Sequence, residues 1–174
     1  MGSGLATEEI RNFLIRLSQQ YSQPVKLYLL GGSALCFLGN PRRTVDIDCV
    51  VELSTEEFTN TLEAVAAELQ VEVEVISIDE FIPLPSNSTA RHHNLEKYGS
   101  IEVFIFDPYS IALSKLARGF DTDIQDILFL LGRGIIEFSM LTKFVEDAIP
   151  QAWDYDIDPD ELRIHLDVVK NLYQ

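Results

Sequence analysis

The sequence predicts an α/β (α+β) fold, with a small mixed β-sheet of about four or five strands, packed helices and a helical C-terminal extension. Short apolar or alternating segments, typical of strands, take turns with longer segments whose apolar residues recur every three or four positions. After residue 134 the helical pattern continues alone. We therefore expect a main domain over residues 5–134 and a helical extension over residues 135–174.

The first half of the chain is expected to alternate between helix and strand. Thr7 is the expected N-cap of the first helix, and Ser54 with Glu57 forms a capping-box pattern that opens the next long helix. The first helix has one apolar face, which consists of Ile10, Phe13, Leu14, Leu17 and Tyr21. Strands are expected where apolar residues are consecutive or alternate, at residues 27–30, 45–49, 71–75 and 100–106.

The second half is expected to be mainly helical. Asp107-Pro108 and Asp158-Pro159 each combine a capping acid with a proline at the first helical position, and Gly119 is a typical helix end. Trp153 is expected to pack the last two helices together. His165 lies beside an apolar stripe and is expected to be structural.

The composition limits the class of protein. The chain has 174 residues, 47% of them apolar, and a formal net charge of −15. Its apolar runs are shorter than the roughly 18 residues of a membrane span, and its N-terminus lacks a signal-peptide pattern, so we expect a cytoplasmic protein without a membrane partner. The acidity disfavours nucleic acid, whose binding depends on Lys and Arg at phosphates. Cys36 and Cys49 lie among apolar residues and are expected to be buried thiols.

Two polar segments have a plain structural interpretation. Residues 79–94 contain two prolines and a polar run, which predicts a long exposed loop carrying His92 and His93. A loop of this length is also typical of a lid or binding segment. Glu72 and Glu74 alternate with valines, so we expect them on the solvated face of a strand.

Asp46 and Asp48 are the first candidates for a metal site. Strand residues alternate between the two faces, so these two carboxylates are expected to project side by side. Like charges at that distance repel each other unless a cation or solvent lies between them. Oxygen ligands of this kind suit Mg²⁺, which usually completes its coordination with water and substrate phosphates.

Gly31-Gly32-Ser33 precedes this pair by about a dozen residues and supplies a complementary feature. Glycines let the backbone approach a ligand closely, and the N-terminus of a following helix attracts anions. A lone Gly-Gly-Ser is more often a simple turn, and a lone Asp-x-Asp is often a solvated strand end. Together, an anion cradle and a carboxylate pair predict binding of a nucleoside triphosphate with its metal.

Gly31-Gly32-Ser33 followed by Thr44-Val45-Asp46-Ile47-Asp48 resembles the signature of the DNA polymerase β-like nucleotidyltransferases in their minimal form. The chain is similar to bacterial nucleotidyltransferase-like toxins of the abortive-infection type. The resemblance implies transfer of a nucleoside monophosphate from an NTP such as ATP, with Mg²⁺ or Mn²⁺ as cofactor. The glycine segment and Thr44 would bind the nucleotide. Arg42 and Arg43 would touch phosphate or acceptor, although a solvated pair is an equal alternative.

The resemblance also implies roles for residues further along the chain. Glu102, the one charge in an apolar strand, would be the third metal-binding acid, although it also fits an exposed strand end. Lys115 and Arg118, with Asp123 and Asp126, resemble a downstream motif in which the lysine meets the triphosphate and the first acid orients it. Without the resemblance, Lys115 is a helix lysine with its amine in solvent, and Asp123 interacts with a helix dipole. Thr122 departs from the basic residue usual in relatives.

Two classes of function follow from the sequence. The first is a metal-dependent nucleotidyltransferase whose acceptor hydroxyl belongs to RNA, a protein or a small cationic molecule. The second is a catalytically inactive protein of the same fold that binds a nucleotide or a protein partner, for example an antitoxin-like protein in a toxin–antitoxin pair. The acidic composition and the imperfect downstream motif favour keeping this alternative.

Overall fold

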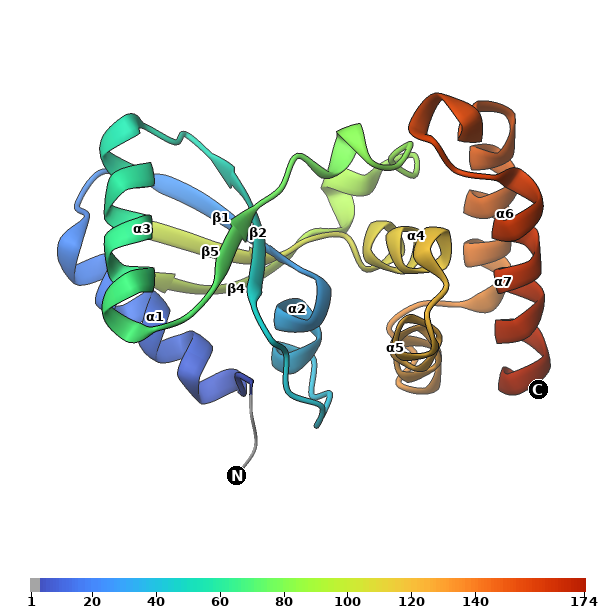
Figure 1. Cartoon of the computed structure of the whole chain (residues 1–174), viewed down its shortest axis with the longest axis horizontal. Helices are drawn as coiled ribbons and strands as arrows, with labels where there is room; N and C mark the ends of the chain where they lie inside the picture. The colour runs from blue at the N-terminus through green and yellow to red at the C-terminus, as the bar shows by residue number, and fades with distance from the viewer. Residues whose placement is uncertain (1–3) are drawn as a thin grey trace. The chain divides into compact units, whose positions relative to one another are not determined.

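The computed structural model describes residues 4–174 and confirms the predicted fold class (Figure 1). The α-helices, 3₁₀ helices (η) and strands occur in the order α1 (Thr7–Gln20), β1 (Val25–Leu30), α2 (Gly31–Phe37), β2 (Ile47–Glu52), α3 (Glu56–Leu69), β3 (Val73–Val75), η1 (Ile78–Glu80), η2 (Ser88–Arg91), β4 (His93–Tyr98), β5 (Ile101–Ile105), α4 (Pro108–Arg118), α5 (Asp121–Gly132), α6 (Phe138–Ala148), η3 (Ile149–Tyr155) and α7 (Pro159–Tyr173). All five strands thus precede α4, and among the described residues only helices follow β5.

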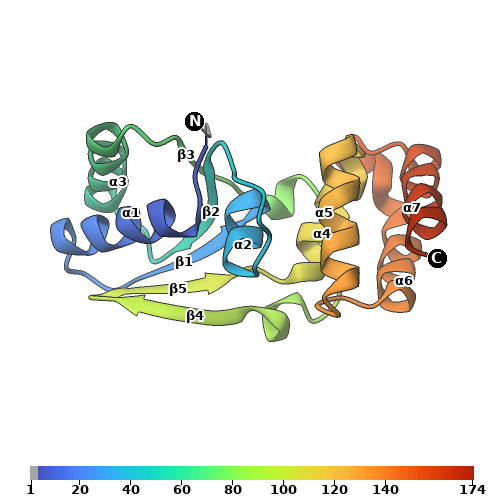
Figure 2. The ribbon, with the colours of Figure 1, turned by 90° about the horizontal axis from the view of Figure 1, so that it is seen from below.

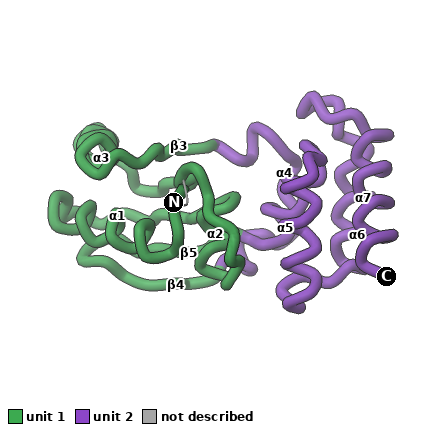
Figure 3. Tube along the Cα trace, turned by 60° about the horizontal axis from the view of Figure 1, so that its bottom comes forward, with its two compact units in different colours: residues 1–76, 93–106 green, residues 77–92, 107–174 purple. Residues whose placement is uncertain are grey.

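The chain divides into two compact units, which are coloured separately in Figure 3. Unit 1 contains the chain up to Ile76 together with His93–Phe106. Unit 2 contains Ser77–His92 together with Asp107–Gln174. The domain boundary that the sequence predicts between residues 134 and 135 stays a prediction.

Unit 1 is built on a five-stranded mixed sheet with the strand order β3-β2-β1-β5-β4. The central strand β1 is antiparallel to β2 and parallel to β5. Outside them, β3 is parallel to β2 and β4 is antiparallel to β5. The strand that precedes the glycine segment is therefore the middle of the sheet, and its last residue leads directly into α2.

Helices α1 and α3 lie on the same face of this sheet (Figure 2). Their buried apolar residues form the core of unit 1 with every second residue of the strands. The core includes Ile10, Phe13, Leu14, Leu17, Leu27, Leu29, Ile47, Cys49, Phe58, Leu62, Val65, Ile101, Val103 and Ile105. The predicted apolar face of the first helix is therefore confirmed. Burial of this side chain set is the main favourable contribution to the stability of the unit.

The starts of α1 and α3 each differ by one residue from the sequence prediction. The N-cap of α1 is Ala6 rather than Thr7. At α3 the hydroxyl of Thr55, rather than Ser54, accepts a hydrogen bond from the backbone N–H of Phe58. At α3 the adjacent Ser54 and Thr55 have the same capping chemistry, so the sequence pattern does not distinguish between them.

Strand β4 occupies residues that the sequence placed partly in a loop. It begins at His93, inside the predicted loop 79–94, and pairs with β5 with a register shift between Asn94 and Glu96. Its side chains are mostly exposed, so it lacks the apolar alternation that identifies a strand. The hydrogen bonds from β5 stabilise this edge strand, and they are not visible in the local sequence.

Helix α4 is the central element of unit 2 and contacts α5, α6, α7 and η2. Its predicted start is confirmed, because the buried carboxylate of Asp107 accepts hydrogen bonds from the backbone N–H groups of Tyr109 and Ser110. The same carboxylate forms two hydrogen bonds, of 2.8 and 2.9 Å, with the guanidinium of Arg91. That guanidinium lies 4.7 Å from the ring centroid of Phe144. Asp107 therefore joins η2, α4 and α6.

The predicted helix ends of unit 2 are confirmed, whereas the predicted packing of Trp153 is wrong. Asp158 caps α7, as predicted, and Gly119 follows the end of α4 with a positive φ of 70°. Trp153 does not pack the last two helices together, because it lies on η3 with 67% of its surface exposed. Within residues 4–174, no helix combines the length and apolarity that a membrane crossing requires.

The two Asp-Pro helix starts allow a matched test of this arrangement. Asp107→Ala should lower the free energy of unfolding by about 3–5 kcal/mol, because it leaves the guanidinium of Arg91 without its buried carboxylate. Asp158→Ala should lower it by about 1 kcal/mol, because only an exposed cap is lost. Urea unfolding of both variants measures the difference. Equal losses would show that the Arg91 pair adds nothing beyond a helix cap.

Candidate active site

Three carboxylates of unit 1 form a cluster: Asp46, Asp48 and Glu74. One carboxylate oxygen from each lies within 4.8 Å of those of the other two. Asp46 and Asp48 are half-buried and Glu74 is exposed. The donors are all oxygens, and at this separation their mutual repulsion is relieved by a divalent cation such as Mg²⁺. The residues present therefore fit the predicted cofactor.

The strand register explains why these three residues meet. Asp48 on β2 pairs directly with Glu74 on the parallel strand β3, so their side chains are neighbours on one face of the sheet. Asp46 lies in the bend just before β2, which begins at Ile47. The predicted proximity of Asp46 and Asp48 is confirmed, and Glu74 completes the group.

Glu102, which the resemblance implied as the third metal ligand, is not part of this cluster. On the central strand β1, Asp48 pairs with Leu30, whereas Glu102 pairs with Lys26, four residues earlier. Four residues correspond to about 13 Å along a strand. Glu102 also pairs with Lys97 on β4, so two lysines flank its charge. The geometry of the cluster thus gives Glu102 no part in it, and its role as a metal ligand stays a prediction.

Gly31 and Gly32 bring the start of α2 into close approach with this cluster. Gly31 has a positive φ of 54°, and a Cβ there would lie 3.0 Å from the carboxylate oxygen Oδ2 of Asp48. A Cβ on Gly32 would lie 2.6 Å from the hydroxyl oxygen of Thr44. Both positions therefore require glycine. The segment begins the helix rather than forming a separate turn before it.

The hydroxyl groups of Ser33 and Thr44 hold the backbone around the cluster. Ser33 is buried and donates to the carbonyl of Leu30 at 2.7 Å. Thr44 is buried and donates to the carbonyl of Asp46 at 3.0 Å. Leu5 and Thr44 also exchange two backbone hydrogen bonds. The bend that carries Asp46 is thus fixed by its own neighbours, and these two hydroxyls bind backbone carbonyls.

The two arginines before the cluster have different environments. Arg42 is exposed, whereas Arg43 is half-buried and forms an ion pair of 2.9 Å with Glu9 on α1. The pKa of Glu9 is lowered by backbone hydrogen bonds, first from its own N–H group and then from Ala6, and by Arg43. The Nε atom of Arg43 is buried and has no hydrogen-bond partner among the described residues. Arg43 therefore retains a donor beside its ion pair.

A groove of about 450 Å³ lies next to the cluster. It is lined by α3 and the segment leading into β3, together with Asp46, and its lining residues are Asp46, Leu62, Glu63, Ala66, Val71, Glu72, Val73 and Glu74. Four of these residues are acidic and four are apolar. This lining repels anions and suits a ligand that combines an apolar part with positive charge.

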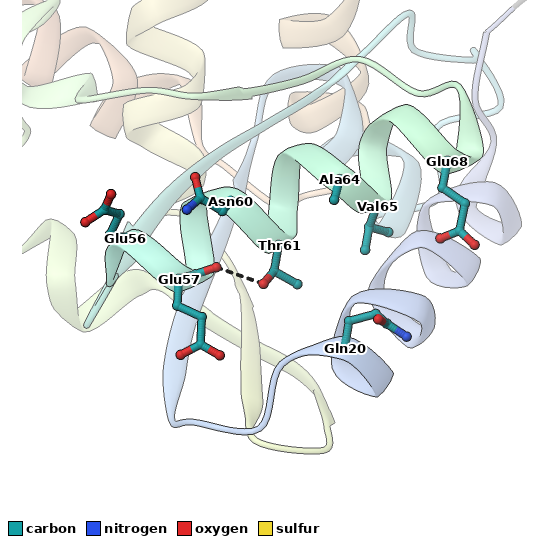
Figure 4. A pocket seen from close by; sticks show the side chains of 8 residues that line it. All are labelled: Gln20, Glu56, Glu57, Asn60, Thr61, Ala64, Val65 and Glu68. Atoms are coloured by element: carbon teal, nitrogen blue, oxygen red, sulfur yellow. Dashed lines mark hydrogen bonds between the residues drawn. The ribbon is translucent and has the colours of Figure 1, made fainter.

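A larger groove of about 530 Å³ lies elsewhere on α3, beside the end of α1 (Figure 4). It is lined by Gln20, Glu56, Glu57, Asn60, Thr61, Ala64, Val65 and Glu68. Within it the hydroxyl of Thr61 donates to the backbone carbonyl of Glu57 at 2.8 Å. None of the three clustered carboxylates lines this groove, so the smaller one is the candidate for a ligand.

Lys115 and Asp123 belong to unit 2, where both side chains are buried. The Lys115 amine lies 2.8 Å from a carboxylate oxygen of Asp126 and 3.8 Å from one of Asp123. Asp123 also accepts from Arg118 at 2.6 Å and from the backbone N–H of Phe120. Lys115 is therefore not exposed to solvent, in contrast to the simple helix interpretation. The predicted roles of Lys115 and Asp123 at the triphosphate stay predictions.

Cysteines and histidines outside the cluster have structural environments. Cys36 and Cys49 are free and buried, as expected, and burial, followed by the charge of Asp48, raises the pKa of Cys49 to about 12. His92 accepts a hydrogen bond from the backbone N–H of Asp107. His165 lies 2.6 Å from the carbonyl of Leu116 and so joins α7 to α4.

The family model described as "Nucleotidyltransferase of unknown function (DUF6036)" matches residues 7–171. The chain belongs to this family. A crystal structure of an antigenic nucleotidyltransferase-like protein from Paracoccidioides brasiliensis has a similar fold, with a TM-score of 0.51 and 17% identity over 92% of this chain and 95% of that chain. Comparison with curated proteins gives no match. The abortive-infection toxin type stays a prediction.

Membership of this nucleotidyltransferase family agrees with the geometry of the cluster. The elements of unit 1 that carry it are a central strand, a helix opened by two glycines, and a neighbouring strand with two acids. At the level of identity found for the solved structure, the similarity supports the fold alone. The chemistry therefore has to be argued from this chain's own residues.

Glu74 is the member of the cluster that the sequence interpretation missed. Its alternation with Val73 and Val75 predicts a solvated strand face. A usable signal was present, because a strand–helix–strand connection usually links two parallel strands. Here that connection is β2-α3-β3, and it places β3 beside the strand of Asp48. This connection makes Glu74 a candidate metal ligand, even though the alternation alone indicates an exposed side chain.

Gly32→Ala should disturb this nucleotidyltransferase site through Thr44. The added Cβ would lie 2.6 Å from the Thr44 hydroxyl oxygen, which itself holds the Asp46 carbonyl. We expect the free energy of unfolding to fall by about 1–3 kcal/mol, and the Mn²⁺ affinity of the folded protein to fall as Asp46 shifts. Urea unfolding and titration with Mn²⁺ measure the two effects.

Gly132→Ala is the matched control, because a Cβ there meets no heavy atom within 4 Å and the residue ends α5. This variant should be neutral or more stable by up to about 1 kcal/mol. If Gly32→Ala matched it in stability and Mn²⁺ affinity, the close contact with Thr44 would have no role in shaping the site.

Proposed function

We propose that the chain is a metal-dependent nucleotidyltransferase that moves a nucleoside monophosphate from an NTP to an acceptor hydroxyl. The observation that carries this proposal is the cluster of Asp46, Asp48 and Glu74 beside the two glycines that open α2. Family membership supports the general class of activity. The metal, the nucleotide and the acceptor belong to the proposal.

In this proposal the three carboxylates hold one or two Mg²⁺ or Mn²⁺ ions. A bound divalent ion would neutralise the charge of the triphosphate and lower the pKa of the acceptor hydroxyl. Gly31 and Gly32 let the start of α2 lie against Asp48 and Thr44, which keeps the backbone of the glycine segment close to the cluster. Arg42, which is exposed, and Arg43, which pairs with Glu9, would contact phosphate or acceptor in this proposal.

The acceptor oxygen attacks the α-phosphorus, the bond to the β-phosphate breaks, and pyrophosphate leaves in line with the attack. The proton of the acceptor hydroxyl passes to solvent. Contacts of Lys115 and Asp123 with the triphosphate stay predictions, since within unit 2 the Lys115 amine is paired with Asp126. Positioning and charge neutralisation account for most of the rate in a transfer of this kind.

The acceptor is RNA, a protein or a small cationic molecule. The groove of about 450 Å³ beside the cluster favours the last of these, because its charged lining is entirely acidic. The net charge of −15 also favours a cationic acceptor over RNA, since it repels the phosphates of RNA. A short cationic segment of a protein would satisfy the same chemistry.

A second candidate function is binding without catalysis, in the cytoplasm and together with a protein partner such as an antitoxin-like protein. Three side chains expected at the nucleotide are engaged elsewhere. Ser33 donates to the backbone, Arg43 pairs with Glu9, and Lys115 pairs with Asp126. Nucleotide binding that is unaffected by removal of the metal, without any transfer, would favour this candidate.

Transfer of label tests the first candidate directly. Each α-³²P-labelled NTP is incubated with the chain, Mg²⁺ or Mn²⁺, and RNA, protein and small-molecule fractions of a cell extract. One fraction should become labelled, and Asp46→Asn or Asp48→Asn should abolish the labelling, because each removes charge from the metal site. Asp147→Asn, an exposed acid on α6, should retain full activity. Full activity in Asp46→Asn would exclude the mechanism.

A second comparison tests which glutamate completes the site. Glu74→Gln should lower the transfer rate by at least about 100-fold, because loss of a metal-ligand charge removes several kcal/mol of transition-state stabilisation. Glu102→Gln should change it by less than about threefold, since Glu102 lies between Lys26 and Lys97. The transfer rates of the two variants are compared with that of the unchanged protein. A large loss in Glu102→Gln together with a small one in Glu74→Gln would identify Glu102 as the third ligand.

A further inference from the structure

Helix α7 carries two apolar stripes on different faces. The inner stripe contains Leu162, Leu166 and Val169, which are buried in unit 2. The second stripe contains Ile164, Val168 and Leu172, whose exposed fractions are 57%, 40% and 58%. We call this second set the outer α7 stripe. An ordinary surface helix needs the inner stripe alone, so the outer stripe calls for a separate explanation.

The spacing of the outer α7 stripe is that of a helix-binding surface. Its residues are four apart, so their side chains lie in one row along the helix. Eight residues from the first to the last correspond to about 12 Å. Rows of apolar anchors at this spacing are what amphipathic helices use to recognise a partner.

The charges beside the stripe are mainly acidic. Asp160, Glu161 and Asp167 are exposed, and at about 100° per residue all three lie within about 100° of the centre of the stripe. The basic residues Arg163 and Lys170 lie about 140° or more from that centre. Arg163 is also within 3.7 Å of Asp160. A partner that covers the stripe therefore meets Asp160 and Asp167 along one border and Glu161 at the N-terminal end.

This charge pattern selects among possible occupants. A second copy of the chain would bring the same acidic borders and a net charge of −15, so the two copies would repel each other. An anionic membrane surface would be repelled for the same reason. A partner with lysines or arginines beside its apolar stripe is attracted along the border of Asp160 and Asp167 and at Glu161, and it buries the exposed side chains at the centre.

We propose that the outer α7 stripe is a docking surface for a basic amphipathic helix of a partner protein. Ile164, Val168 and Leu172 form the apolar centre of the interface, and Asp160, Glu161 and Asp167 supply its charge complement. The surface belongs to unit 2 and does not include the carboxylate cluster of unit 1. The proposal is therefore independent of whether the chain catalyses transfer.

A synthetic peptide serves as the probe. It is an amphipathic helix of about 18 residues, long enough to cover the stripe, with leucines on one face and lysines on both borders. A second peptide has the same leucines and glutamates in place of the lysines. Fluorescence anisotropy with the full chain should show saturable binding of the basic peptide, and at least about tenfold weaker binding of the acidic one.

Variants then locate the binding. The double substitution Ile164→Ser with Leu172→Ser should weaken binding of the basic peptide by at least about tenfold, because it removes two apolar anchors. Ile15→Ser is the matched control, since Ile15 is 41% exposed on α1 of unit 1, and it should leave binding unchanged. Circular dichroism checks that all variants are folded. Asp167→Asn should weaken binding severalfold and reduce its salt dependence.

Several outcomes would overturn the proposal. Unchanged binding in the double variant would mean that the basic peptide is attracted by net charge alone. Equal binding of both peptides would remove the role of the acidic borders. A dimer in sedimentation that the double variant abolishes would assign the stripe to a second copy. Flotation with phosphatidylglycerol vesicles that the double variant abolishes would assign it to a membrane surface.

Discussion

The register of β2 between its two neighbours is the constraint on which the candidate site depends. Asp48 lies opposite Leu30 on one side, at the point where β1 passes into the glycine segment, and opposite Glu74 on the other. A shift by one residue would turn Asp48 to the other face of the sheet, because side chains alternate. The buried Ile47 and Cys49 prevent that shift, since it would expose them and bury the carboxylate. The apolar core of unit 1 thereby determines where the negative charges meet.

The parts of the structure that the sequence predicted are those that local pattern determines. The apolar face of α1, the Asp-Pro starts of α4 and α7, and the closeness of Asp46 to Asp48 all depend on residues within a few positions of each other. The missed parts depend on distant strands. Glu74 and Glu102 each alternate with apolar residues in a strand, and the local pattern alone does not state which of the two strands lies next to β2. That information is in the sheet order β3-β2-β1-β5-β4. Strand β4 was missed for the same reason, because β5 supplies its hydrogen bonds.

Unit 2 contains a buried lysine, Lys115, whose charge is compensated by nearby carboxylates instead of by solvent. Lys115 is 4% exposed, and its amine has carboxylate oxygens of two acids nearby. A buried ammonium without a partner is costly, and the acids of α5 supply the ion pairs that stabilise it. Lys115 and Arg118, which the sequence connects with the triphosphate, thus form ion pairs with Asp123 and Asp126. A phosphate that engages Lys115 has to compete with Asp126, which makes the strength of that pair part of any nucleotide affinity.

The excess of negative charge favours cationic ligands at two places, the carboxylate cluster of unit 1 and the outer α7 stripe of unit 2. In unit 1 it concentrates at Asp46, Asp48 and Glu74 and continues into the neighbouring groove, where it attracts a cation and repels a polyanion. In unit 2 it borders the outer α7 stripe, where exposed apolar side chains alone would invite self-association. Acidic borders suppress that association by like-charge repulsion and leave the stripe open to a basic partner. The same like-charge repulsion opposes pairing of the exposed apolar row on α7 with a second copy of the chain.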